Sequence, residues 1–215
     1  MKKIALVLAG LFMAGALFAA DGFFMNAGVG LQYSPTFWGL NDTIEGVSET
    51  VTMNESIFSI NAYADFYYAR VIIGYGLNTA DPTATASADG ISATETETGV
   101  SDTFLSLTAL GKYPFMLAKN ICLWPAVGLE KVFLLSESVN GASQTISDGQ
   151  QAIESPLYIK IGIGLDILAG NFVITPQIFY SYDLTPNPGS GDLYYSDATY
   201  SGYKFDFGVS FGYKF

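Results

Sequence analysis

Apolar and polar residues alternate with a period of two along eight stretches of the chain. The clearest is the last, where every odd position from Tyr203 to Phe215 is aromatic or Val and every even position is Lys, Asp, Gly or Ser. A period of two is that of a β-strand, so each stretch has one apolar and one polar face. The eight predicted strands lie at residues 26–34, 58–66, 71–78, 105–113, 123–130, 157–167, 172–183 and 201–215.

The segments between these stretches are alternately long and short. Long segments cover residues 35–56, 79–102, 135–154 and 184–200, and short ones lie around 69–70, 114–120 and 169–171. Transmembrane barrels have an even number of strands, short periplasmic turns and long extracellular loops. The last stretch also exceeds the roughly 9–11 residues that a tilted strand needs to cross a bilayer. The pattern predicts an all-β fold: an eight-stranded antiparallel up-and-down transmembrane β-barrel in a bacterial outer membrane, with periplasmic termini and extracellular long loops.

Two prolines fall inside predicted strands. Pro125 and Pro176 cannot donate a hydrogen bond to a ladder, and a closed barrel has no free edge to place them on. We expect a local bulge at each. The single cysteine, Cys122, excludes an internal disulfide and is expected to be a small apolar-like residue near a strand end.

The first twenty residues have the character of a secretory signal peptide. Two lysines precede an apolar run that ends in Ala19-Ala20 before Asp21. The alternative, a single membrane anchor, needs roughly 20 apolar residues. We therefore predict a signal peptide at residues 1–20, cleaved after Ala20 or Ala19, and a barrel domain at residues 21–215.

Charge is scarce and unevenly placed. Charged residues make up 13% of the chain, against about 25% in an ordinary soluble protein. The net charge is −11, and acids crowd into the four long segments while Arg70 and Lys119 fall in short turns. The loops could be a solvated surface, bind divalent cations or a basic partner, or reflect a membrane poor in phosphorylated lipid. Phosphates of nucleic acid would be repelled. The acids expected in exposed loops are Asp42, Glu45, Glu49, Glu55, Asp81, Asp89, Glu95, Glu97, Asp102, Glu137, Asp148, Glu154, Asp192 and Asp197.

The polar faces of the predicted strands carry balanced charges. An eight-stranded interior is about wide enough to be filled by side chains, and charges buried there persist when they are paired. Strand direction sorts them into two layers. We predict that these layers form a structural ion-pair network that closes the lumen, and the alternative is a conducting path. The periplasmic layer contains Asp65, Lys112, Asp166 and Lys214, and the layer toward the loops contains Glu130, Lys160, Lys204 and Asp206.

Catalytic chemistry finds little support in the sequence. There is no His, so a Ser nucleophile lacks its usual base. A zinc site of the His/Cys type is excluded as well. The inward acids have Lys neighbours that would keep them ionised. We predict a non-enzymatic protein without a cofactor or a metal.

The chain resembles the small eight-stranded outer-membrane barrels of the OmpA/OmpX/OmpW group. Phe23-Phe24-Met25-Asn26-Ala27-Gly28 and Gly212-Tyr213-Lys214-Phe215 are most similar to the OmpW branch. The terminal aromatic strand, with Phe211, Tyr213 and Phe215, resembles the insertion signal that acts with the barrel-assembly machinery of the outer membrane. An OmpW-like protein would pass small hydrophobic molecules. Inward side chains that would suit such a path are Ile72, Phe104, Leu110, Trp124 and Phe179.

Two functions therefore stay open. The first is a closed barrel that serves membrane structure or surface interaction and adhesion through its acidic loops. The second is a conduit for small hydrophobic molecules across the outer membrane. A lumen closed by salt bridges would favour the first, and a continuous apolar tunnel the second.

Deletion of Phe215 should impair assembly into the outer membrane, because the terminal aromatic residue resembles the insertion signal. Heat-modifiable gel mobility of the membrane fraction measures the folded barrel. Normal insertion of the shortened chain would contradict the prediction.

Overall fold

The computed structural model describes residues 25–44, 47–79, 81–96, 98–146, 155–185 and 199–215. The predicted signal peptide and acids Glu45, Glu97, Asp148, Glu154, Asp192 and Asp197 lie outside these residues. No helix in the described ranges is long and apolar enough to span a membrane.

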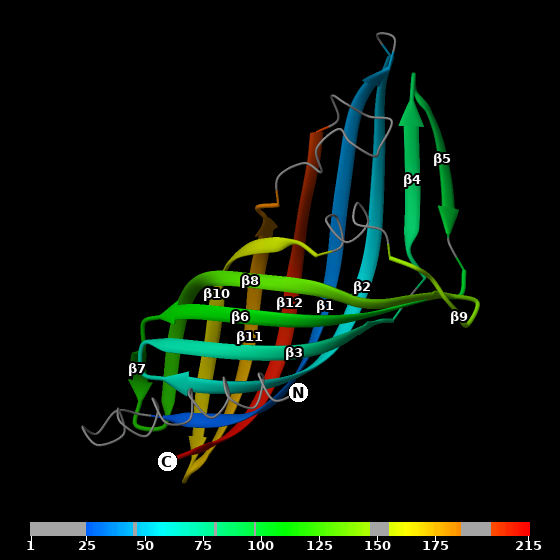
Figure 1. Cartoon of the computed structure of the whole chain (residues 1–215). Coiled ribbons are helices and arrows are strands. Elements are labelled where there is room, and N and C mark those ends of the chain that lie inside the picture. Colours follow the sequence, from blue (N-terminus) through cyan, green and yellow to red (C-terminus); the bar gives the residue numbers. More distant parts are fainter. Residues whose placement is uncertain (1–24, 45–46, 80, 97, 147–154, 186–198) are drawn as a thin grey trace.

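Eight antiparallel strands close into a barrel. Each pairs with its neighbours in the order β1-β12-β11-β10-β8-β6-β3-β2, and pairing of β1 with β2 closes the circle. Figure 1 shows this wall, with the ends of β1 and β12 side by side. The wall strands are β1 (Asn26–Ile44), β2 (Val47–Phe66), β3 (Ala69–Asn78), β6 (Val100–Lys112), β8 (Ile121–Val139), β10 (Leu157–Ala169), β11 (Phe172–Asp183) and β12 (Thr199–Lys214).

Three short connections lie at one end of the barrel, together with the start of β1 and the end of β12. We call this end the termini end. The connections join β2 to β3, β6 to β8 and β10 to β11. The middle one, expected as a plain turn, contains the short strand β7 (Phe115–Ala118), which pairs with β8. In the last, Gly170 has a φ of 66°, a conformation that glycine adopts without strain.

Strands at the other end, the loop end, are longer than the sequence predicted. Residues 35–44 and 47–56, within an expected loop, continue β1 and β2 in unbroken register up to the pair Ile44–Val47. Within the expected loop 79–102, β4 (Thr83–Ala88) pairs with β2, and β5 (Ile91–Thr96) pairs with β4. At the loop end of β8, the short strand β9 (Ala142–Ser143) pairs back with β8 as a hairpin. Together β1, β2, β4 and β5 form a sheet that projects beyond the barrel, which we call the extension (Figure 1).

Neither expected proline bulge is present. The register of β8 with β10 stays constant across Pro125, and that of β11 with β12 stays constant across Pro176. Pro125 is tolerated because β6 ends opposite it, where the amide of Tyr113 donates to its carbonyl. At Pro176 the ladder between β10 and β11 skips two pairs and resumes in the same register. The register shift of the wall lies instead between Thr103 and Phe104.

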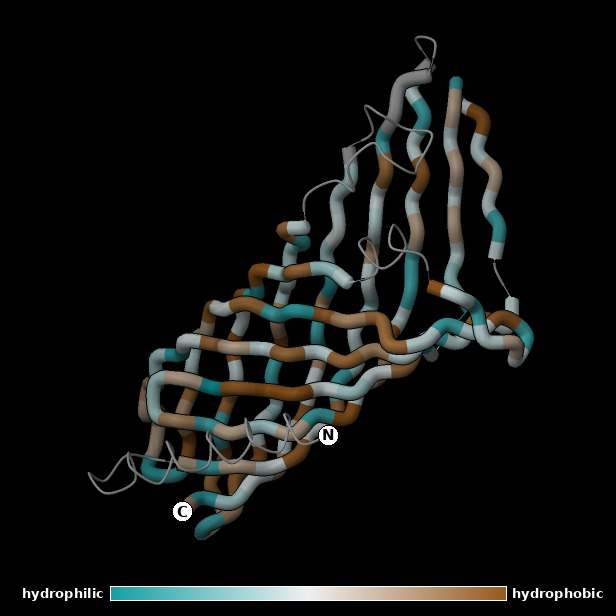
Figure 2. The backbone as a smooth tube through the Cα atoms, viewed as in Figure 1, coloured by the Kyte–Doolittle hydropathy of each residue, from teal (hydrophilic) through white to brown (hydrophobic). Residues whose placement is uncertain are grey.

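The outer face of the wall is apolar and exposed. Val29, Ile60, Val127 and Ile161, on four different strands, are 53–59% exposed. Figure 2 shows hydrophobic residues along the wall and a more polar extension. Monomeric soluble proteins rarely expose contiguous apolar patches larger than a few hundred Å². Because a lipid-facing sheet leaves no backbone group unpaired only when it is closed, the fold is that of a transmembrane β-barrel.

Tyrosines and phenylalanines flank this apolar band at both ends, as membrane interfaces favour. Exposed aromatic residues toward the loop end include Tyr33, Tyr75, Tyr180, Tyr182 and Tyr203. Those toward the termini end are Tyr68, Tyr113, Phe172, Tyr213 and Phe215.

Substitution of Gly164 by Ala should destabilise the barrel, because a Cβ atom there would lie 2.1 Å from Cζ2 of Trp124. Overpacking of this kind costs about 1–3 kcal/mol. Urea unfolding in lipid bilayers, followed by tryptophan fluorescence, measures the change in free energy. Gly111→Ala is the matched control, since its Cβ would make an ordinary 3.7 Å contact with the Val127 carbonyl oxygen. Equal stability of the two variants would contradict the prediction.

Candidate functional site in the barrel lumen

Charged and aromatic side chains fill the lumen in layers. The strand alternation points every second residue inward, and these positions are buried although most are polar. Seven of the eight charged residues predicted to face inward are at least nine-tenths buried. The eighth, Lys214, is half-buried near the end of β12, opposite Asn26 of β1.

Four side chains form a closed ring of alternating charge toward the loop end. Lys160 Nζ lies 2.8 Å from Glu130 Oε2 and 2.7 Å from Asp206 Oδ2. Lys204 Nζ lies 2.9 Å from Glu130 Oε1 and 3.5 Å from Asp206 Oδ1. Each acid therefore contacts both bases, and the net charge of the ring is zero. We call this set the charged ring. Its residues come from β8, β10 and β12, so its ion pairs join these three strands inside the lumen.

Neutral donors complete the coordination of one acid. Asp206 Oδ1 accepts hydrogen bonds from Ser34 Oγ and from Gln32 Nε2, the latter at 3.0 Å. Its Oδ2 accepts one from Ser181 Oγ at 3.2 Å. Buried carboxylates are stable as ions when cations and hydrogen-bond donors surround them. The contacts of Asp206 thus extend the ring to β1 and β11.

A second cluster lies toward the termini end. Lys112 Nζ is 2.6 Å from Asp65 Oδ1 and 3.8 Å from Asp166 Oδ2. Asp166 also accepts a hydrogen bond from Thr175 Oγ1 at 2.7 Å. Arg70 Nη1 lies 3.6 Å from Asp65 Oδ2. Two acids and two bases again balance, and we call these four charged residues the termini-end cluster.

Arg70 is the residue that the sequence analysis misplaced. The prediction that Arg70 falls in a short turn is wrong, because β3 begins at Ala69 and Arg70 is fully buried. Its register with Asp65 places both on the same face of the sheet. The alternation of β3, in which Ile72 and Gly74 also face inward, carries the signal that could have placed it inside.

Aromatic residues separate the two charged layers. Trp124 has no exposed surface, and its ring centroid lies 6.2 Å from that of Phe179. The Arg70 guanidinium is 5.3 Å and the Lys112 ammonium 5.0 Å from the centroid of the Trp124 ring. On the other side, Lys160 Nζ is 5.2 Å from the Phe179 centroid. Such cation–π contacts stabilise charge where water is excluded, so the aromatic layer supports both clusters.

The five apolar residues proposed to line a conduit are all buried but do not form one path. Ile72, Leu110, Trp124 and Phe179 belong to a cluster with Tyr63 and Ala126. Phe104 belongs to a separate cluster with Val132, Leu134 and Tyr158. The charged ring contacts both, because Lys160 lies over Phe179 while Lys204 Nζ is 4.9 Å from the Tyr158 centroid.

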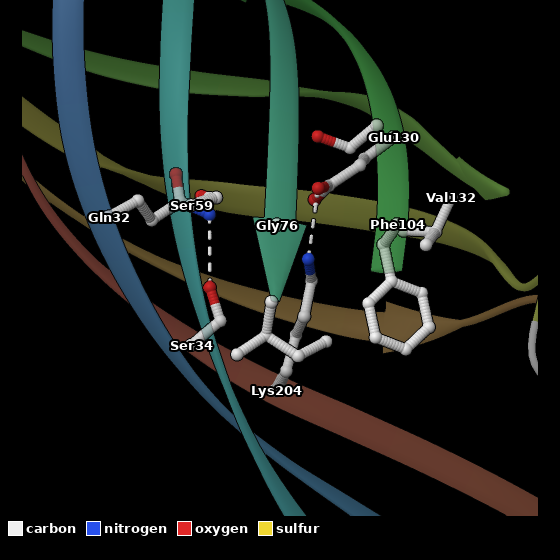
Figure 3. Close-up of a pocket in the computed structure, with 10 residues that line it drawn as sticks. Gln32, Ser34, Ser59, Gly76, Phe104, Glu130, Val132 and Lys204 are labelled. Carbon is white, nitrogen blue, oxygen red and sulfur yellow. Dashed lines mark hydrogen bonds and ion pairs between the residues drawn. The ribbon is translucent and has the colours of Figure 1, made fainter. Parts of the chain in front are cut away.

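A small pocket opens beside the charged ring. Its cavity volume of about 20 Å³ is space for roughly one water molecule. Figure 3 shows Glu130 and Lys204 on one side and Gln32, Ser34 and Ser59 on the other. Phe104 and Val132 add an apolar wall. The pocket is therefore a small recess of mixed polar and apolar lining beside the ring, and it is too small for a hydrocarbon ligand.

Two acids expected on exposed loops lie inside. Glu55 on β2 is 6% exposed and Asp102 on β6 is 7% exposed. They are buried because β2 and β6 continue as strands beyond the predicted boundaries and keep their inward alternation. Asp81, Asp89 and Glu95 are exposed, whereas Glu49 and Glu137 are half-buried. Among the described residues no group of three or more Asp, Glu, Cys or His side chains could hold a metal ion.

The residues that resemble an insertion signal lie on the outer face. Phe211, Tyr213 and Phe215 are 50%, 43% and 68% exposed. The Tyr213 ring packs edge-on against Phe172 and Phe215, with centroids 5.7 Å and 5.6 Å apart. This arrangement leaves the terminal aromatic residues available to lipid or to a protein partner.

The fold and the filled lumen together define a small transmembrane β-barrel protein. No protein-family model matches the chain, and no curated protein sequence matches it.

Several solved structures of outer-membrane barrels are similar to it. Neisserial surface protein A is 10% identical over 88% of this chain and 99% of its own, with a TM-score of 0.46. OprG from Pseudomonas aeruginosa is 13% identical over 88% and 97%, with a TM-score of 0.41. The protease OmpT from Escherichia coli is 10% identical over 90% and 98%, with a TM-score of 0.46.

Substitution of Lys160 by Met should destabilise the barrel strongly, because it removes one of the two cations that contact Glu130 and Asp206. Breaking a buried ion pair on one side costs about 3–5 kcal/mol. Urea unfolding in lipid bilayers measures the loss, and the double variant Lys160→Met, Glu130→Gln should recover part of it.

Lys119→Met, at an exposed position of the turn before β8, is the control. Exposed substitutions usually change stability by less than about 0.5 kcal/mol. A Lys160→Met variant as stable as this control would show that the ring contributes nothing to stability.

Proposed function

We propose that the protein is a non-enzymatic outer-membrane β-barrel whose lumen is closed, and that it serves membrane structure or surface interaction. The observation that carries the proposal is the charged ring, in which Glu130, Lys160, Lys204 and Asp206 are all buried and mutually paired. A transported ion or polar solute would have to break these pairs at a cost of several kcal/mol.

The layers beneath the ring support closure. Trp124 and Phe179 lie between the ring and the termini-end cluster. An ion would therefore meet an apolar aromatic layer after passing the ring. A hydrophobic molecule would meet charged residues on both sides of that layer. The order of these layers supports a lumen that offers neither class of solute a continuous path.

The lengths of the connections support the orientation. Short connections lie at the termini end and the extension lies at the loop end. Bacterial barrels place short turns in the periplasm and long segments outside. We infer that both termini are periplasmic and that the extension faces the exterior, where Asp81, Asp89 and Glu95 would present an acidic surface to a basic partner.

The side chains of the lumen support a non-catalytic role. The sequence contains no His, and each carboxylate of the ring contacts two lysines. A general base must be free to take up a proton. Carboxylates held between cations are poor candidates for that task.

A conduit for small hydrophobic molecules is the second candidate. It is favoured by the apolar cluster of Phe104, Val132, Leu134 and Tyr158 next to the pocket. The register shift at Phe104 is a place where the wall could open sideways. An OmpW-like function of this kind would need a lateral exit above the charged ring.

Proteoliposomes that carry the refolded barrel should show neither ion conductance nor uptake of an apolar solute above empty liposomes, because the lumen is closed. Planar-bilayer recording measures conductance, and a fluorescent apolar probe measures uptake. Uptake without conductance would overturn the closed barrel in favour of the lateral conduit. Conductance by the wild-type barrel would exclude both.

A further inference from the structure

The extension ends in a strand with one free side. In the part of the chain that the structure describes, β5 pairs only with β4, and it is the last strand of the sheet order. All six of its residues are exposed. Figure 1 shows β5 at the outer side of the extension, with β4 between it and β2. A row of backbone N–H and C=O groups on β5 is therefore open to another strand.

Proteins usually protect such an edge with Lys, Pro, a bulge or a very short strand. The sequence of β5, Ile-Ser-Ala-Thr-Glu-Thr, has neither Lys nor Pro. Its register with β4 runs without a shift from Ile91 to Thr96. The edge thus has no bulge and is uncovered among the described residues, and it suits the addition of an extended strand.

The two faces of the hairpin specify what kind of strand fits. Hydroxyl groups face each other across β4 and β5 in the pairs Thr83–Thr96, Thr85–Thr94 and Ser87–Ser92, at 3.4, 3.0 and 2.8 Å. On the other face, Ala84, Ala86 and Ala88 of β4 lie opposite Glu95, Ala93 and Ile91 of β5. A strand that continues this pattern needs hydroxyl residues at every second position, and β5 itself has that pattern.

We propose that β5 is a homotypic docking strand, which pairs antiparallel with β5 of a second copy of this chain. The fitting register places Thr94 opposite Thr94, Ser92 opposite Thr96 and Ala93 opposite Glu95. All three hydroxyl residues then meet hydroxyl residues, and the only charge of the strand meets alanine instead of its own copy. Shifting by one residue would place the hydroxyl side chains against Ile91, Ala93 or Glu95, because successive side chains face opposite ways.

The pairing has a consequence for where the two copies sit, which rests on the membrane orientation proposed above. Copies in one membrane are related by rotation about the membrane normal, so β5 runs toward or away from the membrane in the same sense in both copies. Antiparallel pairing requires the two strands to run in opposite senses. The two copies must therefore sit in facing membranes, so the contact is one between cells. A short strand pair binds weakly by itself, and many copies on each surface would strengthen it.

Engineered cysteines test the register. The background is Cys122→Ala, which removes the only native thiol. In the proposed register, Thr94→Cys alone should form a disulfide-linked dimer under mild oxidation, because directly opposite Cα atoms are about 4.5–5.5 Å apart and a disulfide spans about 4.4–6.8 Å. Glu95→Cys is the matched control. It faces Ala93 of the other copy and should not cross-link above background.

A second pair of variants and a vesicle assay complete the test. Ser92→Cys mixed with Thr96→Cys should cross-link, whereas either variant alone should do so several-fold less. Two fluorescently distinct populations of proteoliposomes should aggregate with the wild-type barrel and fail to do so with Thr94→Lys. Heat-modifiable mobility must show that each variant is folded.

Two results would overturn the homotypic pairing. One is the absence of a Thr94→Cys dimer when vesicles that carry this variant are mixed, and the other is cross-linking of Glu95→Cys to the same extent as Thr94→Cys. These results are independent of conductance. A barrel that neither conducts ions nor cross-links would refute only the docking strand. A barrel that conducts ions and cross-links would refute only the closed lumen.

Discussion

Complete backbone pairing in the wall is the constraint on which the structure depends. A bilayer offers no partner for a free N–H or C=O group, so a sheet that crosses it must close. β1 meets this requirement by pairing with β2 on one side and β12 on the other. Closure with eight strands leaves a lumen about as wide as the side chains that fill it. The charges that point inward then have little water and must find one another. The charged ring and the termini-end cluster are thus consequences of a narrow closed sheet.

The sequence predicted the wall well because lipid requires one face of each strand to be apolar. The stretch 172–183 coincides with β11, and Glu130 and Lys204 were placed in the same layer from strand direction alone. Their direct contact could not be predicted, since it joins residues 74 positions apart through the registers of the intervening strands. Prediction failed for residues 35–56, because beyond the bilayer neither face has to be apolar and β-strands there lose their clear alternation. Glu55 was misplaced for the same reason, and Arg70 was misplaced because the predicted strand begins at residue 71, two residues after the observed start of β3.

The ion pairs also specify the register of the barrel. Lys204 and Asp206 are two residues apart on β12 and both contact Glu130 or Lys160 from other strands. A slip of β12 by two residues would keep the apolar residues outside but would remove these contacts from the ring. Hydrophobic alternation alone cannot prevent such a slip, because it repeats every two residues. Buried polar contacts are known to select one arrangement among similar ones in some proteins. Here Ser34 and Ser181, which donate to Asp206, add the same selectivity from β1 and β11.

The continuity of β1 and β2 from the wall into the extension has a mechanical consequence. Their ladder runs in one register from the pair Asn26–Asp65 to the pair Ile44–Val47. A pulling force along β1 and β2 is therefore passed through two continuous strands from the extension into the wall. No hinge separates the projecting sheet from the part that is anchored by lipid. The extension can therefore pass load directly to the part of the barrel that lipid surrounds.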